Sequence, residues 1–61
     1  RSYIGKNGTT LTPLRPAGTV RIDKKRVDAV SRGDYIDKDV PVRVIEAEGM
    51  RVVVETIESD T

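Results

Sequence analysis

The chain has 61 residues, enough for one small domain, and its 11 basic side chains nearly balance its 10 acidic ones. The net charge of +1 gives no strong field of one sign, so bulk charge favours no polyanionic partner. Because there is no Cys and no His, disulfides, thiolate chemistry and zinc sites of the Cys/His type are excluded.

β-Branched residues dominate the composition, with nine Val, five Ile and six Thr against two Leu and three Ala. Such side chains suit a pleated surface and lose rotamer freedom in helices, so this ratio favours strands. No apolar run approaches the length of about 18 residues that a membrane-spanning helix needs, and no signal peptide is visible. We therefore expect the segment itself to be soluble. Because it does not begin with Met, we also expect it to be a piece of a longer protein.

The chain opens with a lead-in over residues 1–7 and then alternates between apolar runs and turns that contain Gly or Pro. The apolar runs predict five strands, near residues 9–14, 18–23, 25–31, 41–48 and 50–57. A flat sheet of this size would bury too little apolar surface, so we expect an all-β domain in which the strands curl into a mostly antiparallel barrel. The predicted domain spans residues 8–57, with a frayed tail at 58–61.

Two local features of the predicted second and third strands bear on how they pair. Asp23-Lys24-Lys25 is the expected tip of the hairpin between the second and third strands. In the third strand, Val27 and Ala29 fall on the opposite parity from Val30. This mismatch predicts either a bulge or a strand that is buried on both faces.

The longest connection runs from residue 31 to residue 41 and can hold one short helical turn. We expect Tyr35 and Ile36 to pin it to the core. Gly49, between two Val-rich runs, gives the strongest hairpin signal. The predicted core consists of Leu11, Val20, Ile22, Ala29, Ile36, Val44 and Val53.

Few residues offer catalytic or metal-binding chemistry. Ser31, with Gly33 after it, weakly resembles a nucleophile turn, but a strand-end serine that bonds to backbone explains it better. One loop carries three carboxylates that could hold a hard cation: Asp34, Asp37 and Asp39. Ile36 and Lys38 stand where a calcium loop needs ligands, which favours a solvated acidic turn. We expect a non-enzyme with no catalytic residues, metal or cofactor.

A cluster of basic residues surrounds the predicted hairpin tip: Arg21, Lys24, Lys25 and Arg26. A binding site for single-stranded nucleic acid combines such a basic surface with aromatic side chains on which bases stack. The two aromatic residues are Tyr3, in the lead-in, and Tyr35, which we place in the core. The cluster is therefore interpreted first as a solvated tip, with nucleic acid or anionic lipid headgroups as alternatives.

The order and spacing of several short segments resemble the C-terminal domain of the NfeD (nodulation formation efficiency D) family. These segments are Ile4-Gly5-Lys6-Asn7-Gly8, Leu14-Arg15-Pro16-Ala17-Gly18, Val20-Arg21-Ile22-Asp23, Asp28-Ala29-Val30-Ser31 with Gly33 and Ile36, Val42-Arg43-Val44, Gly49, and Val52-Val53-Val54. The resemblance covers residues 4 to 57. It implies an OB-fold, so the predicted barrel becomes a small five-stranded OB-fold-like β-barrel.

The chain departs from the family pattern at two turns. Family members usually have Gly after the Asp at the first hairpin tip, where this chain has Lys24. Without Gly, a tight turn of type I′ is costlier, so we expect a longer or bulged tip. The family also tends to have Gly at the position of Asp39, and Asp tolerates left-handed backbone better than most residues do.

The resemblance implies a binding or scaffolding role at a membrane. Family proteins place this domain after transmembrane helices and are typically encoded beside stomatin- or flotillin-like proteins, and long members add a protease domain upstream. We therefore expect a non-catalytic protein-interaction domain, membrane-associated through its parent, with a stomatin- or flotillin-like partner. The alternative is a nucleic-acid-binding OB-fold domain. The candidate interaction surface consists of Arg15, Arg32, Lys24, Lys25 and Arg26.

Overall fold

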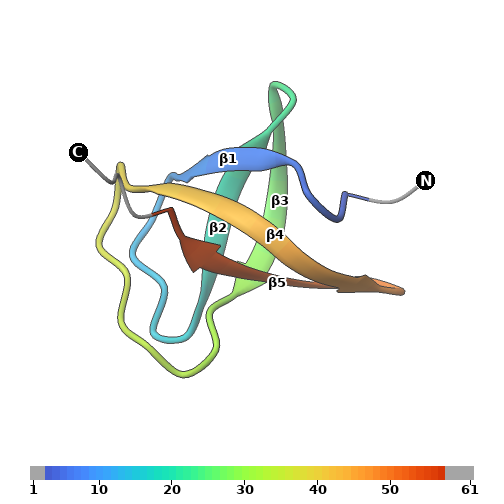
Figure 1. The fold of residues 1–61 in the computed structure, drawn as a ribbon. Coiled ribbons are helices and arrows are strands. Elements are labelled where there is room, and N and C mark those ends of the chain that lie inside the picture. The colour runs from blue at the N-terminus through green and yellow to red at the C-terminus, as the bar shows by residue number, and fades with distance from the viewer. Residues whose placement is uncertain (1–2, 58–61) are drawn as a thin grey trace.

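The computed structural model describes residues 3–57, which form five strands that close into a barrel (Figure 1). The strands are β1 (Asn7–Thr10), β2 (Ala17–Ile22), β3 (Lys25–Val30), β4 (Pro41–Glu48) and β5 (Arg51–Thr56). Each overlaps one predicted strand, so the all-β class and the barrel are confirmed. Within the described residues no helix is long and apolar enough to cross a bilayer. The tail predicted at 58–61 lies outside the described residues.

The order of the strands around the barrel is β1, β2, β3, β5, β4 and back to β1. Neighbours are antiparallel except β3 and β5, which run parallel and pair only between Val30 and Val53. In Figure 1 the β4–β5 hairpin crosses the β2–β3 ribbon and extends beyond it. A closed barrel of five short strands in this order is an OB-fold-like architecture.

The core consists of apolar side chains from four strands and from the loops: Leu14, Val20, Ile22, Ala29, Ile36, Val42, Val44, Val52, Val53 and Val54. Six of the seven predicted core residues are buried, and Leu11 is only half-buried. The prediction for Leu11 is wrong because β1 ends at Thr10. Beyond that strand the chain bends, and Leu14 takes the buried position instead.

Tyr35 is 58% exposed, so its expected place in the core is wrong. The next residue, Ile36, forms an isolated bridge with Leu14, and both of these side chains are buried. Because neighbouring residues in extended backbone point to opposite sides, the inward direction of Ile36 turns Tyr35 outward. The connection around them contains bends and turns but no helical turn.

The β2–β3 hairpin is tighter than expected. Ile22 pairs with Lys25, so only Asp23 and Lys24 form the turn, with φ angles of 53° and 68°. Positive φ at both central residues is the mark of a type I′ turn, whose twist matches that of the flanking strands. The expectation of a longer or bulged tip is therefore wrong. The favourable twist outweighs the strain of a left-handed Lys24.

The pairing of β3 with β2 is uninterrupted, so the parity mismatch in β3 reflects burial on both faces and not a bulge. Ala29 is buried, and Val27 and Val30 are both half-buried. The register shift of the sheet lies instead in β4, between Val44 and Glu46. It leaves Ile45 as the extra residue, a β-bulge that bends the long β4 strand around the barrel.

Candidate interaction surface

The structure divides the five candidate interaction residues between the two ends of the β2–β3 ribbon. At one end Ile22 pairs with Lys25, and Lys24, Lys25 and Arg26 surround the turn. At the other end Ala17 pairs with Val30, and the chain continues into the loops that hold Arg15 and Arg32. Figure 1 shows these ends at the top and the bottom of the barrel. All five side chains are exposed, but they form two surfaces and not one.

The end that holds Arg15 and Arg32, which we call the loop end, is built on the bridge between Leu14 and Ile36. The N–H of Leu14 donates to the carbonyl of Ile36 at 2.8 Å, and the N–H of Ile36 donates to the carbonyl of Leu14 at 3.1 Å. Arg15 follows Leu14 and Tyr35 precedes Ile36, so these two exposed side chains lie close together on the surface. The Cζ atom of Arg15 lies 5.6 Å from the centre of the Tyr35 ring, which is the geometry of a cation–π contact.

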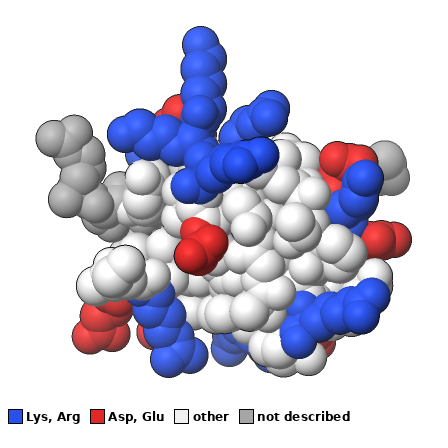
Figure 2. All heavy atoms as spheres, turned by 180° about the vertical axis from the view of Figure 1, so that it is seen from behind, with Lys and Arg blue, Asp and Glu red and all other residues white. Residues whose placement is uncertain are grey.

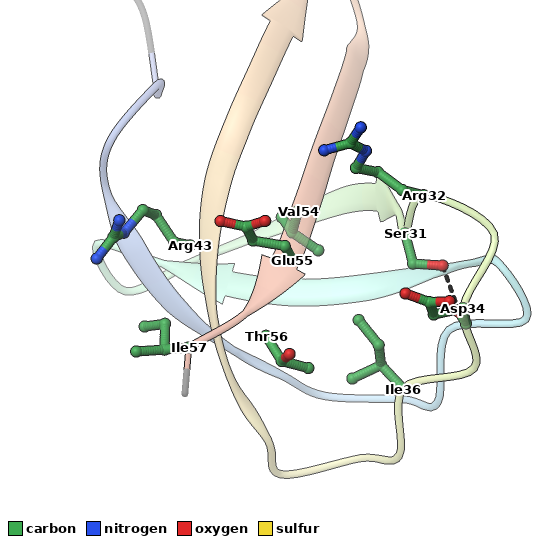
Figure 3. A pocket seen from close by; sticks show the side chains of 9 residues that line it. All are labelled: Ser31, Arg32, Asp34, Ile36, Arg43, Val54, Glu55, Thr56 and Ile57. Atoms are coloured by element: carbon green, nitrogen blue, oxygen red, sulfur yellow. Dashed lines mark hydrogen bonds between the residues drawn. The ribbon is translucent and has the colours of Figure 1, made fainter. Parts of the chain in front are cut away.

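A shallow hollow lies beside this bridge, between the β3–β4 loop and the end of β5 (Figure 3). Its lining mixes both signs of charge with apolar side chains: Ser31, Arg32, Asp34, Ile36, Arg43, Val54, Glu55, Thr56 and Ile57. The loop that forms one wall is fixed, because Ser31 donates its N–H to the carbonyl of Pro16 at 2.8 Å and its hydroxyl to the carbonyl of Asp34.

Two of the residues considered for catalysis or metal binding, Ser31 and Asp37, form hydrogen bonds with neighbouring backbone. Ser31 is buried, and its hydroxyl hydrogen-bonds to loop backbone, as expected for a serine at a strand end. Asp37 accepts the N–H of Lys38 with its own carboxylate at 3.0 Å. Among residues 3–57, no group of three or more Asp and Glu side chains is placed to hold a metal ion. The hydrogen bonds give Ser31 and Asp37 roles in holding the backbone of this loop.

The hairpin end carries a concentration of positive charge. Figure 2, seen from behind, shows Lys and Arg side chains gathered at the top of the molecule, where Figure 1 places the β2–β3 tip. Arg21 and Arg26 are direct cross-strand partners, and both are exposed. Asp23 in the turn is joined to Lys6 by an ion pair with an N–O distance of 3.0 Å.

A third surface, which the sequence did not reveal, follows the seam between β3 and β5. These strands pair at one position only, so the rest of that edge of β3 has no paired strand among the described residues. Met50 at the tip of the β4–β5 hairpin is 95% exposed and lines hollows on this seam together with Val27, Val30 and Val52. The seam depends on strand pairings distant in sequence, so no local signal could have found it.

Neither aromatic residue belongs to the two strands whose outer face binds nucleic acids in OB-folds. In that fold the outer face of the second and third strands and the adjoining loops bind oligonucleotides. Tyr3 is half-buried against the core, and Tyr35 stacks with Arg15 at the loop end. The outer β2–β3 face therefore lacks the stacking side chains on which single-stranded nucleic acids bind.

The fold and these surfaces define a small OB-fold-like binding domain. The chain belongs to the NfeD family, because residues 1–55 match the family model described as the NfeD-like C-terminal, partner-binding domain. It is 56% identical over 54 residues to Membrane protein NfeD1b of Bacillus subtilis (strain 168). That match covers 88% of this chain and 12% of the relative, so the chain spans about an eighth of that protein's length.

Among solved structures, the chain is similar to the C-terminal domain of stomatin operon partner protein 1510-C from Pyrococcus horikoshii. The TM-score is 0.88 at 28% sequence identity, and the match covers 93% of this chain and 91% of that one. The near-complete coverage of both chains confirms the predicted family and the predicted architecture together.

Proposed function

We propose that this chain is the protein-interaction domain of a membrane-anchored parent, and that its partner is a stomatin- or flotillin-like membrane protein. The observation that carries the proposal is the match of residues 1–55 to a family model described as partner-binding. Two relatives support its finer parts: one is named a membrane protein and the other a stomatin operon partner. The domain itself would act by binding, without catalysis or cofactor.

We assign partner binding to the loop end, around Arg15, Tyr35 and Arg32. Arg and Tyr are enriched among the residues that dominate binding energy at protein interfaces. Here they stand out from the surface next to a hollow of mixed charge, which gives a partner both an anchor and polar groups to pair with.

The loop end is also held rigidly, which favours tight binding. The Leu14–Ile36 bridge, the two hydrogen bonds of Ser31 and the buried side chains beneath them fix the loops before any partner arrives. An interface that is ordered in advance loses little conformational entropy on association. The seam at Met50 has apolar surface but no comparable cation–aromatic pair.

The test is a calorimetric titration of this chain with the soluble domain of a stomatin- or flotillin-like protein encoded beside the parent. Tyr35→Ala and the double variant Arg15→Glu/Arg32→Glu should each weaken binding by about tenfold or more, the size of a hot-spot loss. The matched control is Lys24→Glu/Lys25→Glu, which reverses the same number of charges at the other end and should leave the affinity within about twofold.

A second titration addresses nucleic acid. Fluorescent single-stranded DNA and RNA are added to the chain at about 150 mM salt, the physiological ionic strength. We expect no saturable binding at low micromolar concentration. Saturable binding that is weakened by charge reversal at Lys24, Lys25 and Arg26, together with no heat on addition of the stomatin-like protein, would replace the proposal with a nucleic-acid-binding function.

A further inference from the structure

The end of the barrel opposite the proposed partner surface presents four cations, which we call the basic tip: Arg21, Lys24, Lys25 and Arg26. All four are exposed. Within residues 3–57, the ion pair that the structure contains joins Lys6 to Asp23, so the acidic group of the turn is already engaged by a cation outside the tip. The charges of the basic tip are therefore available to an external anion.

Two features of the basic tip are locally unfavourable. Arg21 and Arg26 stand directly opposite each other on the ribbon, and like charges in such a pair repel. Lys24 occupies left-handed backbone at φ 68°, a conformation that a residue with a side chain adopts at a cost. The type I′ turn requires that conformation, so the fold accounts for Lys24. The repulsion between Arg21 and Arg26 is a cost at an exposed turn, and it points to a role beyond folding.

The shape and chemistry of the basic tip favour a flat anionic surface. The tip projects from one end of the barrel, and its turn holds only two residues, so the four charges are displayed on a stiff protrusion (Figure 1). Nucleic acid fits less well, because neither aromatic residue belongs to the tip, which therefore offers a base no aromatic side chain to stack on. Anionic phospholipid headgroups require only charge, which acts within a Debye length of the membrane.

We propose that the basic tip contacts anionic phospholipid headgroups at the membrane surface. This inference rests on the proposed membrane-anchored parent, which would bring the domain within reach of the bilayer. Each Lys or Arg near an anionic surface strengthens binding by about fivefold, so the tip alone gives a weak and reversible contact. Its consequence is orientation: with the tip against the bilayer, the loop end with Arg15 and Tyr35 faces away from the lipid.

The experiment is co-sedimentation of this chain with vesicles of phosphatidylcholine alone or mixed with phosphatidylglycerol. At about 0.1 M salt the Debye length is about 10 Å, so the vesicle surface attracts the charges of the tip but is screened from those at the far end of a domain 32 Å long. We expect binding to the mixed vesicles only. Lys24→Glu/Lys25→Glu should weaken it by about 25-fold or more, the product of two fivefold steps. Lys24→Gln/Lys25→Gln removes the charge with little change in size and should show a similar loss. It provides the test if the reversal variant unfolds.

The matched control is Arg15→Glu/Arg32→Glu, which changes the net charge equally but at the loop end, and it should bind vesicles within about twofold of the parent chain. Equal losses in the two double variants would show attraction by net charge and overturn the proposal. Binding to neutral vesicles as strong as to anionic ones would do so too, as would no binding to either. Tighter binding to a single-stranded oligonucleotide at the same salt would assign the tip to nucleic acid. The partner titration uses the same variants with the opposite expected pattern, so the two proposals fail separately.

Discussion

Thr10 and Val40 hold each other by hydrogen bonds in both directions. The N–H of Thr10 donates to the carbonyl of Val40 at 3.0 Å, and the N–H of Val40 donates to the hydroxyl oxygen of Thr10 at 2.9 Å. The same hydroxyl donates to the carbonyl of Asp37 at 2.7 Å, and the side chain is fully buried. A single threonine at the end of β1 thus fixes the end of the long β3–β4 connection.

Thr10→Val should therefore destabilise the domain although it preserves shape. The change leaves the N–H of Val40 and the carbonyl of Asp37 without their partner, which costs about 1–3 kcal/mol when such groups are buried. Urea denaturation followed by circular dichroism gives the free energy of unfolding. Thr9→Val, at the exposed neighbouring position, is the control and should stay within about 0.5 kcal/mol of the parent. Equal effects of the two changes would contradict this role of the hydroxyl.

Ile22→Ala tests the core. Ile22 is fully buried between β1 and β3, so its truncation leaves a cavity and should lower the free energy of unfolding by about 2–5 kcal/mol. Domains are stable by only about 5–15 kcal/mol, and one this small has little to spare. Ile45→Ala, at the half-buried bulge position, should cost clearly less in the same denaturation experiment. A melting temperature of Ile22→Ala within a few degrees of the parent would be incompatible with this core.

Two adjacent lysines should respond to glycine with opposite signs. Lys24 lies in left-handed backbone, so Lys24→Gly relieves strain and should raise the free energy of unfolding by about 0.5–1 kcal/mol. Lys25 begins β3 and pairs with Ile22, so Lys25→Gly should lower it by about 0.5–1 kcal/mol. Thermal and urea denaturation of the two variants side by side checks the turn. Destabilisation by Lys24→Gly would contradict the two-residue type I′ geometry.

The strands were predictable because their signal is local. Alternation at Val20 and Ile22, and Gly49 between two Val-rich runs, determine strand and hairpin without distant contacts. Leu11 and Tyr35 were misplaced because their burial depends on which residues form the Leu14–Ile36 bridge, a contact between two loops. The two-residue tip does not follow from Lys24 alone, because the gain from matching the twist of β2 and β3 offsets the preference of lysine for right-handed backbone.

For the candidate surface, too, some features follow from local sequence and others depend on distant contacts. Exposure of Arg15, Arg32 and the lysines of the tip follows from their charge. Their separation into two ends follows from the predicted hairpin, whose tip holds the lysines while Arg15 and Arg32 flank its open end. The contact between Arg15 and Tyr35 and the open seam at Met50 could not be inferred, because they arise from pairings between distant segments.

The central claim is that the loop end binds the protein partner, and nuclear magnetic resonance tests it most directly. Backbone amide shifts of the isotope-labelled chain are followed while the soluble domain of the stomatin- or flotillin-like protein is added. We predict that the largest changes fall on Arg15, Arg32, Tyr35 and the residues that line the neighbouring hollow, while the tip at Lys24 shifts little. Changes centred on Met50 and the β3–β5 seam, or no change at saturating partner, would contradict it.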